Sequence, residues 1–185
     1  MPTIITHALV GAAIAAAGQP RPVSGRLCAA AAVCAALPDL DVVTFAMNVP
    51  YGNLMGHRGL SHSLVAAAAL ATVVSLGAGL KARRHTAPGA GVSWGRAWTV
   101  LFLATASHGL LDMCTDGGRG VAILSPWDTT RYFFPWRPIA VSPIGGQFFS
   151  PRGLTVLFSE IRWVWSPTAT ALAVAWLIRS RWARE

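Results

Sequence analysis

The 185 residues are enough for one domain, and we expect residues 1–185 to form a single one. Charged residues make up 12% and apolar residues 54% of the chain, whereas soluble domains are roughly a quarter charged. This balance excludes an ordinary soluble domain and indicates lipid as the main solvent. The net charge of +8 could indicate a nucleic-acid partner, but the basic residues flank apolar runs, which is typical of membrane topology. We therefore expect membrane lipid, and no nucleic acid, as the partner.

Five apolar segments predict an all-α fold, an integral membrane bundle of about five helices. The first, residues 4–18, is short and rich in Ala and Gly, so it could pack closely as a short or tilted helix. No basic region precedes it, so it does not resemble a cleaved signal sequence. The other four come close to the roughly 20 residues that cross a bilayer; they are 27–47, 60–80, 97–114 and 164–178.

The stretch from residue 115 to residue 163 is predicted to form an irregular outer cap. Its prolines and glycines exclude one long helix. Its aromatic residues make it too apolar for a disordered linker, and aromatic rings are favoured where lipid meets water. They are Trp127, Tyr132, Phe133, Phe134, Trp136, Phe148 and Phe149.

The basic residues predict an orientation. One face of the predicted bundle carries nine of the 15 Lys and Arg residues, and by the positive-inside rule it is cytoplasmic. The N-terminus is then outside and the C-terminus inside. The nine residues are Arg21, Arg26, Lys81, Arg83, Arg84, Arg96, Arg179, Arg181 and Arg184.

Histidines and acids gather at the opposite, outer face. They come from four separate predicted helices and the loop before the third. Ionisable groups at membrane depth cost roughly 2.5 kcal/mol or more each, so they normally pair or bind something, and a metal ion is an efficient partner. The predicted metal ligands are His7, Asp39, Asp41, His57, His62, His108 and Asp112.

The spacing of these residues supports a shared site. His108 and Asp112 are four residues apart and lie on one helix face. Pro38 implies a break in its helix that could turn both Asp39 and Asp41 inward. Mixed imidazole and carboxylate ligands suit Zn²⁺, with Mn²⁺ or Fe²⁺ as substitutes.

Several residues also fit simpler roles. A lone His7 on an apolar helix is more often a packed residue than a ligand, and the Asp pair could form buried salt bridges with Arg58. Arg58 could bind phosphate or anchor a lipid head group. Three further acids could complete the ligand set, act as a general base or be ordinary loop residues; they are Asp116, Asp128 and Glu160. His85, in the basic linker, is read as solvated.

Four motifs in this order, separated by apolar helices, resemble a known family. They are Thr6-His7, Pro-Asp-Leu-Asp at 38–41, His-Arg-Gly-Leu-Ser-His at 57–62 and Ser-His-x-x-x-Asp at 107–112. Over roughly residues 3–145 the chain resembles the YdjM-type family of bacterial inner-membrane proteins, regarded as metal-dependent hydrolases. That family is more remotely similar to zinc-dependent phospholipase C and to the single-strand-specific zinc nucleases, which cleave phosphodiesters.

The resemblance implies roles for individual residues. His108 and Asp112 match the His-x-x-x-Asp pair of those enzymes, Asp39 or Asp41 their metal-bridging acid, and His57 and His7 further ligands. His62 belongs to the membrane family's own motif. The soluble enzymes carry a later His-x-x-x-Glu pair, and no His follows His108 here, so one or two ions are expected rather than three. Glu160 or Asp116 would be the substitutes.

The function expected from these observations is metal-assisted hydrolysis of a phosphoester on a lipid or lipid-linked substrate, in a bacterial inner membrane and at its outer face. The expected catalytic residues are Asp39, Arg58 and Asp116, with Arg58 neutralising phosphate charge. A structural metal site or a metal-ion transporter is the alternative. A transporter needs polar residues through the whole membrane depth, whereas the inner halves of these helices are nearly all Ala, Val and Leu.

Overall fold

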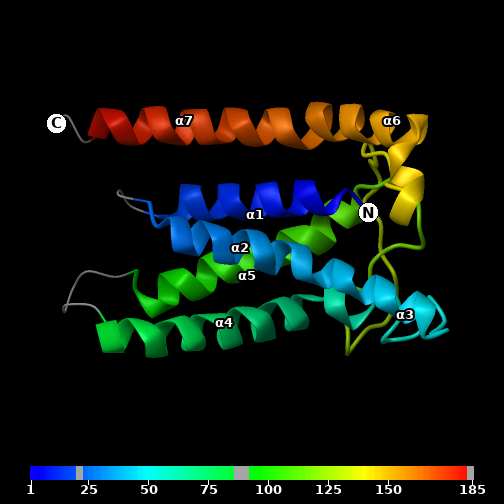
Figure 1. Ribbon diagram of the computed structural model, residues 1–185, viewed down its shortest axis with the longest axis horizontal. Helices are drawn as coiled ribbons and strands as arrows, with labels where there is room; N and C mark the ends of the chain where they lie inside the picture. The colour runs from blue at the N-terminus through cyan, green and yellow to red at the C-terminus, as the bar shows by residue number, and fades with distance from the viewer. Residues whose placement is uncertain (20–22, 86–91, 183–185) are drawn as a thin grey trace.

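The computed structural model describes residues 1–19, 23–85 and 92–182, with side chains omitted over 78–85 and at 182. Within these ranges the regular elements are all helices and no strand occurs, which confirms the all-α prediction (Figure 1). Two isolated bridge pairs, Thr115 with Ile139 and Val121 with Tyr132, order the segment that follows the fourth long helix.

The helices join into five long rods. The first is α1, Ile4–Gly18. In the second, α2 (Gly25–Ala36) continues through the 3₁₀ turn η1 (Leu37–Val42) into α3 (Val43–Ala46). The third and fourth are α4 (Leu64–His85), preceded by the 3₁₀ turn η2 (Leu60–His62), and α5 (Trp94–Met113). In the fifth, α6 (Pro151–Glu160) continues through the π-helical turn η4 (Ile161–Trp165) into α7 (Ser166–Trp182).

The predicted cap ends earlier than expected. Residues 151–163, which were assigned to the cap because of Pro151 and Gly153, are helical in the structure. Pro151 stands in the first turn of α6, where a proline costs nothing because the amide it lacks has no partner inside the helix. The irregular segment therefore runs from Cys114 to Ser150 and includes only the short turn η3, Gly145–Phe149.

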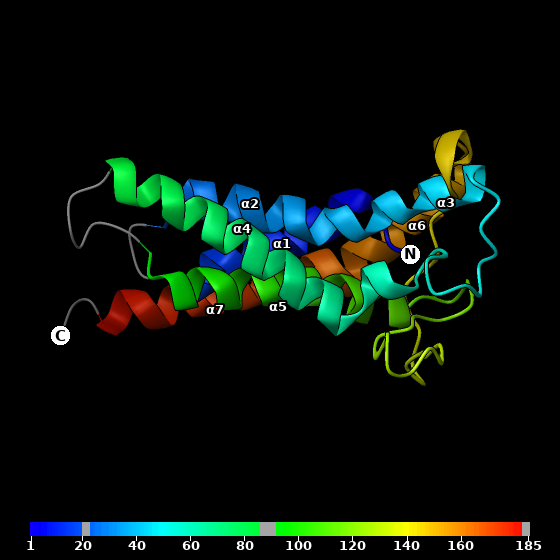
Figure 2. The same cartoon turned by 90° about the horizontal axis from the view of Figure 1, so that it is seen from below.

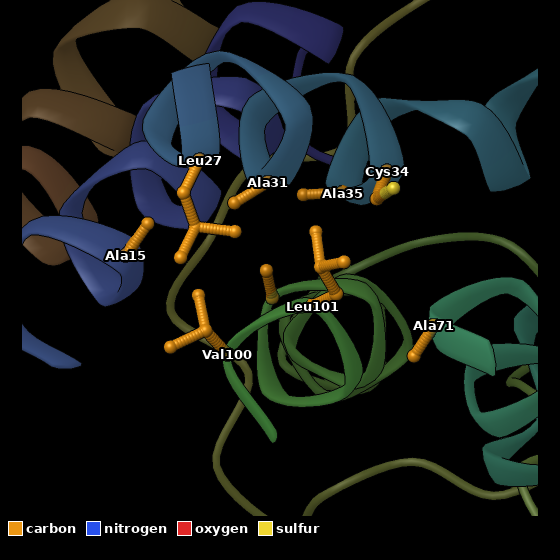
Figure 3. Packing of buried hydrophobic residues seen from close by; sticks show 9 residues of the cluster. Ala15, Leu27, Ala31, Cys34, Ala35, Ala71, Val100 and Leu101 are labelled. Atoms are coloured by element: carbon orange, nitrogen blue, oxygen red, sulfur yellow. The ribbon is translucent and has the colours of Figure 1, made fainter. Parts of the chain in front are cut away.

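Four rods share a core that is rich in alanine. Ala15 of α1, Ala31 of α2, Ala71 of α4 and Leu101 of α5 are almost fully buried members of this core (Figure 3). The helices approach so closely that a Cβ atom on Gly11 would lie 2.6 Å from the carbonyl oxygen of Ala31. Small residues allow this close packing in apolar bundles. The fifth rod instead lies along α1 (Figure 1).

One stretch within the described part of the chain, Gly25–Ala46, is both long and apolar enough to cross a membrane by length and composition. Two shorter apolar helices are Ile4–Gly18 and Leu64–Gly77. The five helical segments of the sequence prediction are therefore present, while the crossing of a membrane by all five stays a prediction.

All five rods run between the same two ends of the molecule (Figures 1 and 2). The start of α1, η1, η2, the end of α5 and the irregular segment meet at one end, which we call the site end. Arg26, Arg96 and Arg179 belong to helix termini at the opposite end. Arg21, Arg184 and the side chains of Lys81, Arg83, Arg84 and His85 lie outside the described part of the structure.

Candidate metal centre

Five of the seven predicted ligands meet inside the site end. They are His7 from α1, Asp39 from η1, His62 from η2, and His108 and Asp112 from α5, and all are buried. Their ligand atoms form two groups in which every atom lies within 4.8 Å of the others: His7, His108 and Asp112, and Asp39, His62 and His108. His108 belongs to both groups and is the centre of the cluster.

Short distances connect the two groups. The Nε2 atoms of His62 and His108 lie 3.0 Å apart. Asp39 Oδ1 is 3.3 Å from His108 Nε2, and Asp112 Oδ2 is 3.4 Å from His62 Nε2. The ring of His7 stacks on that of His108 at a centroid distance of 3.6 Å, and its Nε2 is 3.5 Å from Asp112 Oδ1.

The far side of two imidazole rings is held by acceptors. His108 Nδ1 lies 2.7 Å from the carbonyl oxygen of Ala35, and His62 Nδ1 lies 3.1 Å from Asp41 Oδ2. A carbonyl oxygen only accepts, so Nδ1 of His108 carries the proton and its Nε2 presents a lone pair. The carboxylate of Asp41 is likewise an acceptor, so Nδ1 of His62 also carries a proton. Metal-binding histidines in proteins are oriented by this kind of outer contact.

Buried polar atoms at the centre lack hydrogen-bond partners. Both ring nitrogens of His7 and all four carboxylate oxygens of Asp39 and Asp112 are buried without a hydrogen bond. Burying such groups unpaired costs several kcal/mol for an ionised carboxylate, so proteins normally pair them or use them as metal ligands. The donor set, imidazole nitrogen with carboxylate oxygen, fits a divalent ion such as Zn²⁺.

The formal charges lead to the same conclusion. Asp39, Asp41 and Asp112 contribute three negative charges, and Arg58 contributes one positive charge 2.9 Å from Asp112 Oδ2. With neutral imidazoles, these four side chains leave a charge of −2, which one divalent cation would neutralise. The same acids also favour a positive charge on a neighbouring imidazole in the metal-free chain. Burial alone lowers the pKa of His62, but Asp112 and Asp41 outweigh it and raise the pKa to about 9.

The two acids of the Pro-Asp-Leu-Asp motif separate, contrary to the expectation that both turn inward. Asp39 is buried among the histidines, whereas Asp41 faces the loop and accepts hydrogen bonds from the Arg58 amide and the Ser61 hydroxyl. The reason is the 3₁₀ geometry of η1. With about three residues per turn, positions two apart point roughly 240° from each other. Pro38 does not break the rod, because it sits in the first turn of η1.

His57 is not in either group of ligand atoms. Its Nδ1 binds Asp41 Oδ1, and its ring lies between Phe45 and Tyr51, with centroid distances of 5.2 and 5.5 Å. His57 and Asp41, both predicted as ligands, therefore form an outer layer around His62. This arrangement makes them supports for the cluster rather than members of it.

Arg58 is buried and pairs with an acid, as one of the alternatives from the sequence had it, but the acid is Asp112 and not the Asp39 and Asp41 pair. Its side chain is 1% exposed, and besides facing Asp112 it donates to the Gly117 carbonyl and the Thr115 hydroxyl. Its backbone has a φ of 60°, in the left-handed region that costs a non-glycine residue energy. This guanidinium does not reach the surface, as a head-group anchor must, while its predicted role toward a phosphate stays a prediction.

The three additional acids also have other partners. Asp116 is exposed and accepts a hydrogen bond from the Val141 amide. Asp128 accepts from the Tyr132 hydroxyl and the Thr130 amide. Glu160 is buried and accepts from the first turn of α1. Asp116, predicted as catalytic, and Glu160, a possible ligand, thus lie outside the described cluster.

Sequence reasoning did not identify two supports of the site. The Ala35 carbonyl has no sequence signal, because any residue could supply it. Gly109 has a weak sequence signal, because it directly follows His108. A Cβ atom there would lie 2.7 Å from the His62 carbonyl oxygen, so glycine lets α5 approach η2 closely enough to bring the two histidines together.

Comparison with known proteins agrees with this picture. The family model described as YdjM inner membrane protein matches residues 1–183. The chain is also 40% identical over 177 residues to Inner membrane protein YbcI of Escherichia coli (strain K12), covering 95% of this chain and 98% of that protein. No solved structure matches. The resemblance stated from the motifs is thereby confirmed: the chain belongs to the YdjM family of inner membrane proteins.

Proposed function

We propose that this inner membrane protein is a metal-dependent hydrolase that binds one divalent ion, most simply Zn²⁺, at its site end. The observation that carries the metal assignment is the convergence of the His62 and His108 Nε2 atoms with the unpartnered carboxylates of Asp39 and Asp112. Phosphoester hydrolysis is supported by the resemblance to zinc phosphodiesterases and by the imidazole and carboxylate donors, which hydrolytic zinc sites use.

One ion is favoured over two by the state of His108. The two groups of ligand atoms share this residue, and its Nδ1 is occupied by the Ala35 carbonyl. Its imidazole therefore offers one lone pair, at Nε2, and a single lone pair binds a single ion. His7, Asp39, His62, His108 and Asp112 would together hold that ion.

A bound ion would supply Lewis acidity and lower the pKa of a coordinated water to near neutrality. The residues of the chain provide the rest. Asp41 and the Ala35 carbonyl hold the two imidazole rings in the orientation that binding requires. Arg58 offsets the charge of Asp112 in a place where water is excluded.

We further propose that the rods cross the membrane with the site end outside. Apolar side chains on the outer surfaces of the rods support an environment of lipid, among them Val33, Val73, Leu103 and Leu177. The basic residues at the opposite end support a cytoplasmic location for it. The substrate proposed for a site at this depth is a phosphoester on a lipid or lipid-linked molecule.

A second candidate, a structural metal site, is favoured by one specific observation. Every residue of the two ligand groups is buried. A structural ion has a closed coordination shell, whereas a catalytic ion keeps one position for water or substrate.

An activity assay separates the two. Purified protein is loaded with Zn²⁺ and assayed for release of phosphate or alcohol from phospholipid and from a bis-aryl phosphodiester, alongside His108→Ala and Asp39→Ala. Asp128→Asn, in the irregular segment away from the cluster, is the control. Hydrolysis is expected in wild type and control and is lost in both cluster variants. Full activity in those variants would refute the assignment, and stable zinc without turnover would favour the structural role.

A further inference from the structure

Glu160 is a buried acid that the proposed function does not use. It is fully buried and accepts three hydrogen bonds, from the amide of Thr3 and from the hydroxyls of Thr3 and Thr6, the two hydroxyl distances being 2.7 Å each. The indole Nε1 of Trp165 donates to the same Thr6 hydroxyl at 2.6 Å. Residues 157 positions apart in the sequence are thus joined at the first turn of α1.

The π-helical turn explains how one rod supplies both groups. Glu160 ends α6 and Trp165 ends η4, five residues later. A π turn closes with hydrogen bonds between residues five apart, so it brings such positions closer to one face, whereas an α-helix would point them about 140° away from each other. Turns of this kind are frequent at functional sites.

The same rod also holds the far end of α1. The guanidinium of Arg179 donates to the carbonyls of Ala16, Ala17 and Gln19, where α1 ends. An acid at the N-terminus and a base at the C-terminus are the arrangement that the helix dipole favours. The fifth rod, α6 through α7, therefore holds α1 at both ends and fixes its position along the helix axis (Figure 1).

His7 depends on this placement more than the other histidines do. The Nδ1 atoms of His62 and His108 are held by Asp41 and by the Ala35 carbonyl. Neither ring nitrogen of His7 makes a hydrogen bond, so no outer contact of its own sets the ring. The position of the His7 ring is therefore set by the rotation of α1 about its axis and by the position of α1 along that axis. Glu160 and Trp165 hold the neighbouring residue, Thr6.

We propose that Glu160 is the positioning residue for His7, and that it couples the C-terminal rod to the metal centre. This rests on the proposed function for its metal readout but not for its structural one. A shift of α1 by part of a turn removes His7 from Asp112 and unstacks it from His108. The remaining ligands stay in place, because they belong to other rods.

The first test measures Co²⁺ binding by full-length protein in nanodiscs of phosphatidylglycerol and phosphatidylethanolamine, through the visible absorption of the ion. Glu160→Gln and the milder Trp165→Phe are compared with His7→Ala. Changing a group behind a metal ligand typically costs 10–100-fold in affinity, so Glu160→Gln is expected to weaken Co²⁺ binding about tenfold and to give the His7→Ala spectrum. Wild-type affinity and spectrum in Glu160→Gln would overturn the proposal.

Ser159→Ala is the matched control. Ser159 precedes Glu160 on α6, and its hydroxyl accepts from the Ala140 amide and donates to the Pro138 carbonyl of the irregular segment rather than to α1. It should lower thermal stability but leave the Co²⁺ spectrum unchanged. An equal spectral change in Ser159→Ala would mean that any damage to α6 acts on the site, and the specific role of Glu160 would be refuted.

The second test needs no metal. In metal-free protein the stacking of His7 on His108 should shift the ring protons of His7 upfield, with the His7→Ala spectrum giving the assignment. Glu160→Gln should lose this shift and Ser159→Ala should keep it; retention in Glu160→Gln would overturn the proposal. If wild-type protein binds no Co²⁺, the proposed metal centre fails, while this measurement still decides the role of Glu160.

Discussion

His62 and His108 point their Nε2 atoms at each other across 3.0 Å, while the Nδ1 atom of each ring faces an acceptor. Two neutral rings held in this way would present lone pair to lone pair, which is repulsive. A cation between them turns the repulsion into attraction, and that cation is a proton on His62 in the metal-free chain or a metal ion in its place. A substitution of His108 should therefore affect metal binding more than a substitution elsewhere in the cluster, because His108 also belongs to both groups of ligand atoms.

His108→Ala should therefore abolish tight metal binding, whereas His57→Ala should only weaken it. His57 contacts the site through Asp41 and is an outer support, for which losses of about 10–100-fold in affinity are typical. Zinc titration with a competing chelator measures both affinities. Equal losses in the two variants would show that the distinction between inner and outer histidines is wrong.

The number of ions is a separate prediction. We expect one Zn²⁺ per chain, because the single available lone pair of His108 cannot serve two ions. Elemental analysis of protein reconstituted with excess Zn²⁺ and then desalted gives the ratio. Two tightly held ions per chain, both lost in His108→Ala, would contradict the deduction.

Metal affinity should rise with pH. In the metal-free chain, Asp112 and Asp41 outweigh burial and raise the pKa of His62 to about 9, so below pH 9 the incoming ion must displace a proton from this ring. Affinity should then increase about tenfold per pH unit up to about pH 9 and level off above it. Asp41→Asn removes one of the charges that hold the proton, so the plateau should begin at lower pH. A pH-independent affinity between pH 6 and 9 would contradict the assignment of His62 as a ligand.

Gly109 sets the approach of α5 to η2. Gly109→Ala places a Cβ atom 2.7 Å from the His62 carbonyl oxygen, which is backbone and cannot swing away. Overpacking of this kind typically costs about 1–3 kcal/mol, and here it also pushes His62 away from His108, so both stability and zinc affinity should fall. Gly95→Ala on the same helix meets open space and should change neither. Thermal unfolding and zinc titration of the two variants test this pair, and unchanged zinc affinity in Gly109→Ala would contradict it.

Arg58→Ala should act on stability rather than on substrate affinity. It removes the arginine that pairs with the fully buried Asp112. Breaking a buried ion pair from one side typically costs about 3–5 kcal/mol. Denaturant unfolding of metal-free protein measures the loss. A stable variant whose sole defect is a raised KM for a phosphoester would contradict this and would support the substrate role predicted for Arg58 from the sequence.

The sequence predicted the structure correctly where a pattern is compatible with a single geometry. The helical segments follow from apolar runs, and His108 with Asp112 from their four-residue spacing. It did not separate Asp39 from Asp41, because their directions depend on whether the turn is α-helical, 3₁₀ or broken, and Pro38 is compatible with all three. It left the partner of Arg58 open, between a phosphate, a lipid head group and the Asp pair, because the contacts that bury the guanidinium come from Asp112, Thr115 and Gly117, which are distant in sequence. The helix from residue 151 was missed because a proline marks a helix start as readily as a loop.

The central claim is that imidazoles from separate rods bind one cation, and X-ray absorption at the zinc edge of metal-loaded protein tests it most directly. The account predicts one Zn²⁺ per chain with imidazole scattering from at least two histidines at about 2.0–2.1 Å, disappearing in His108→Ala. Protein that remains folded yet retains no zinc after desalting, or zinc whose spectrum shows no imidazole, would contradict it.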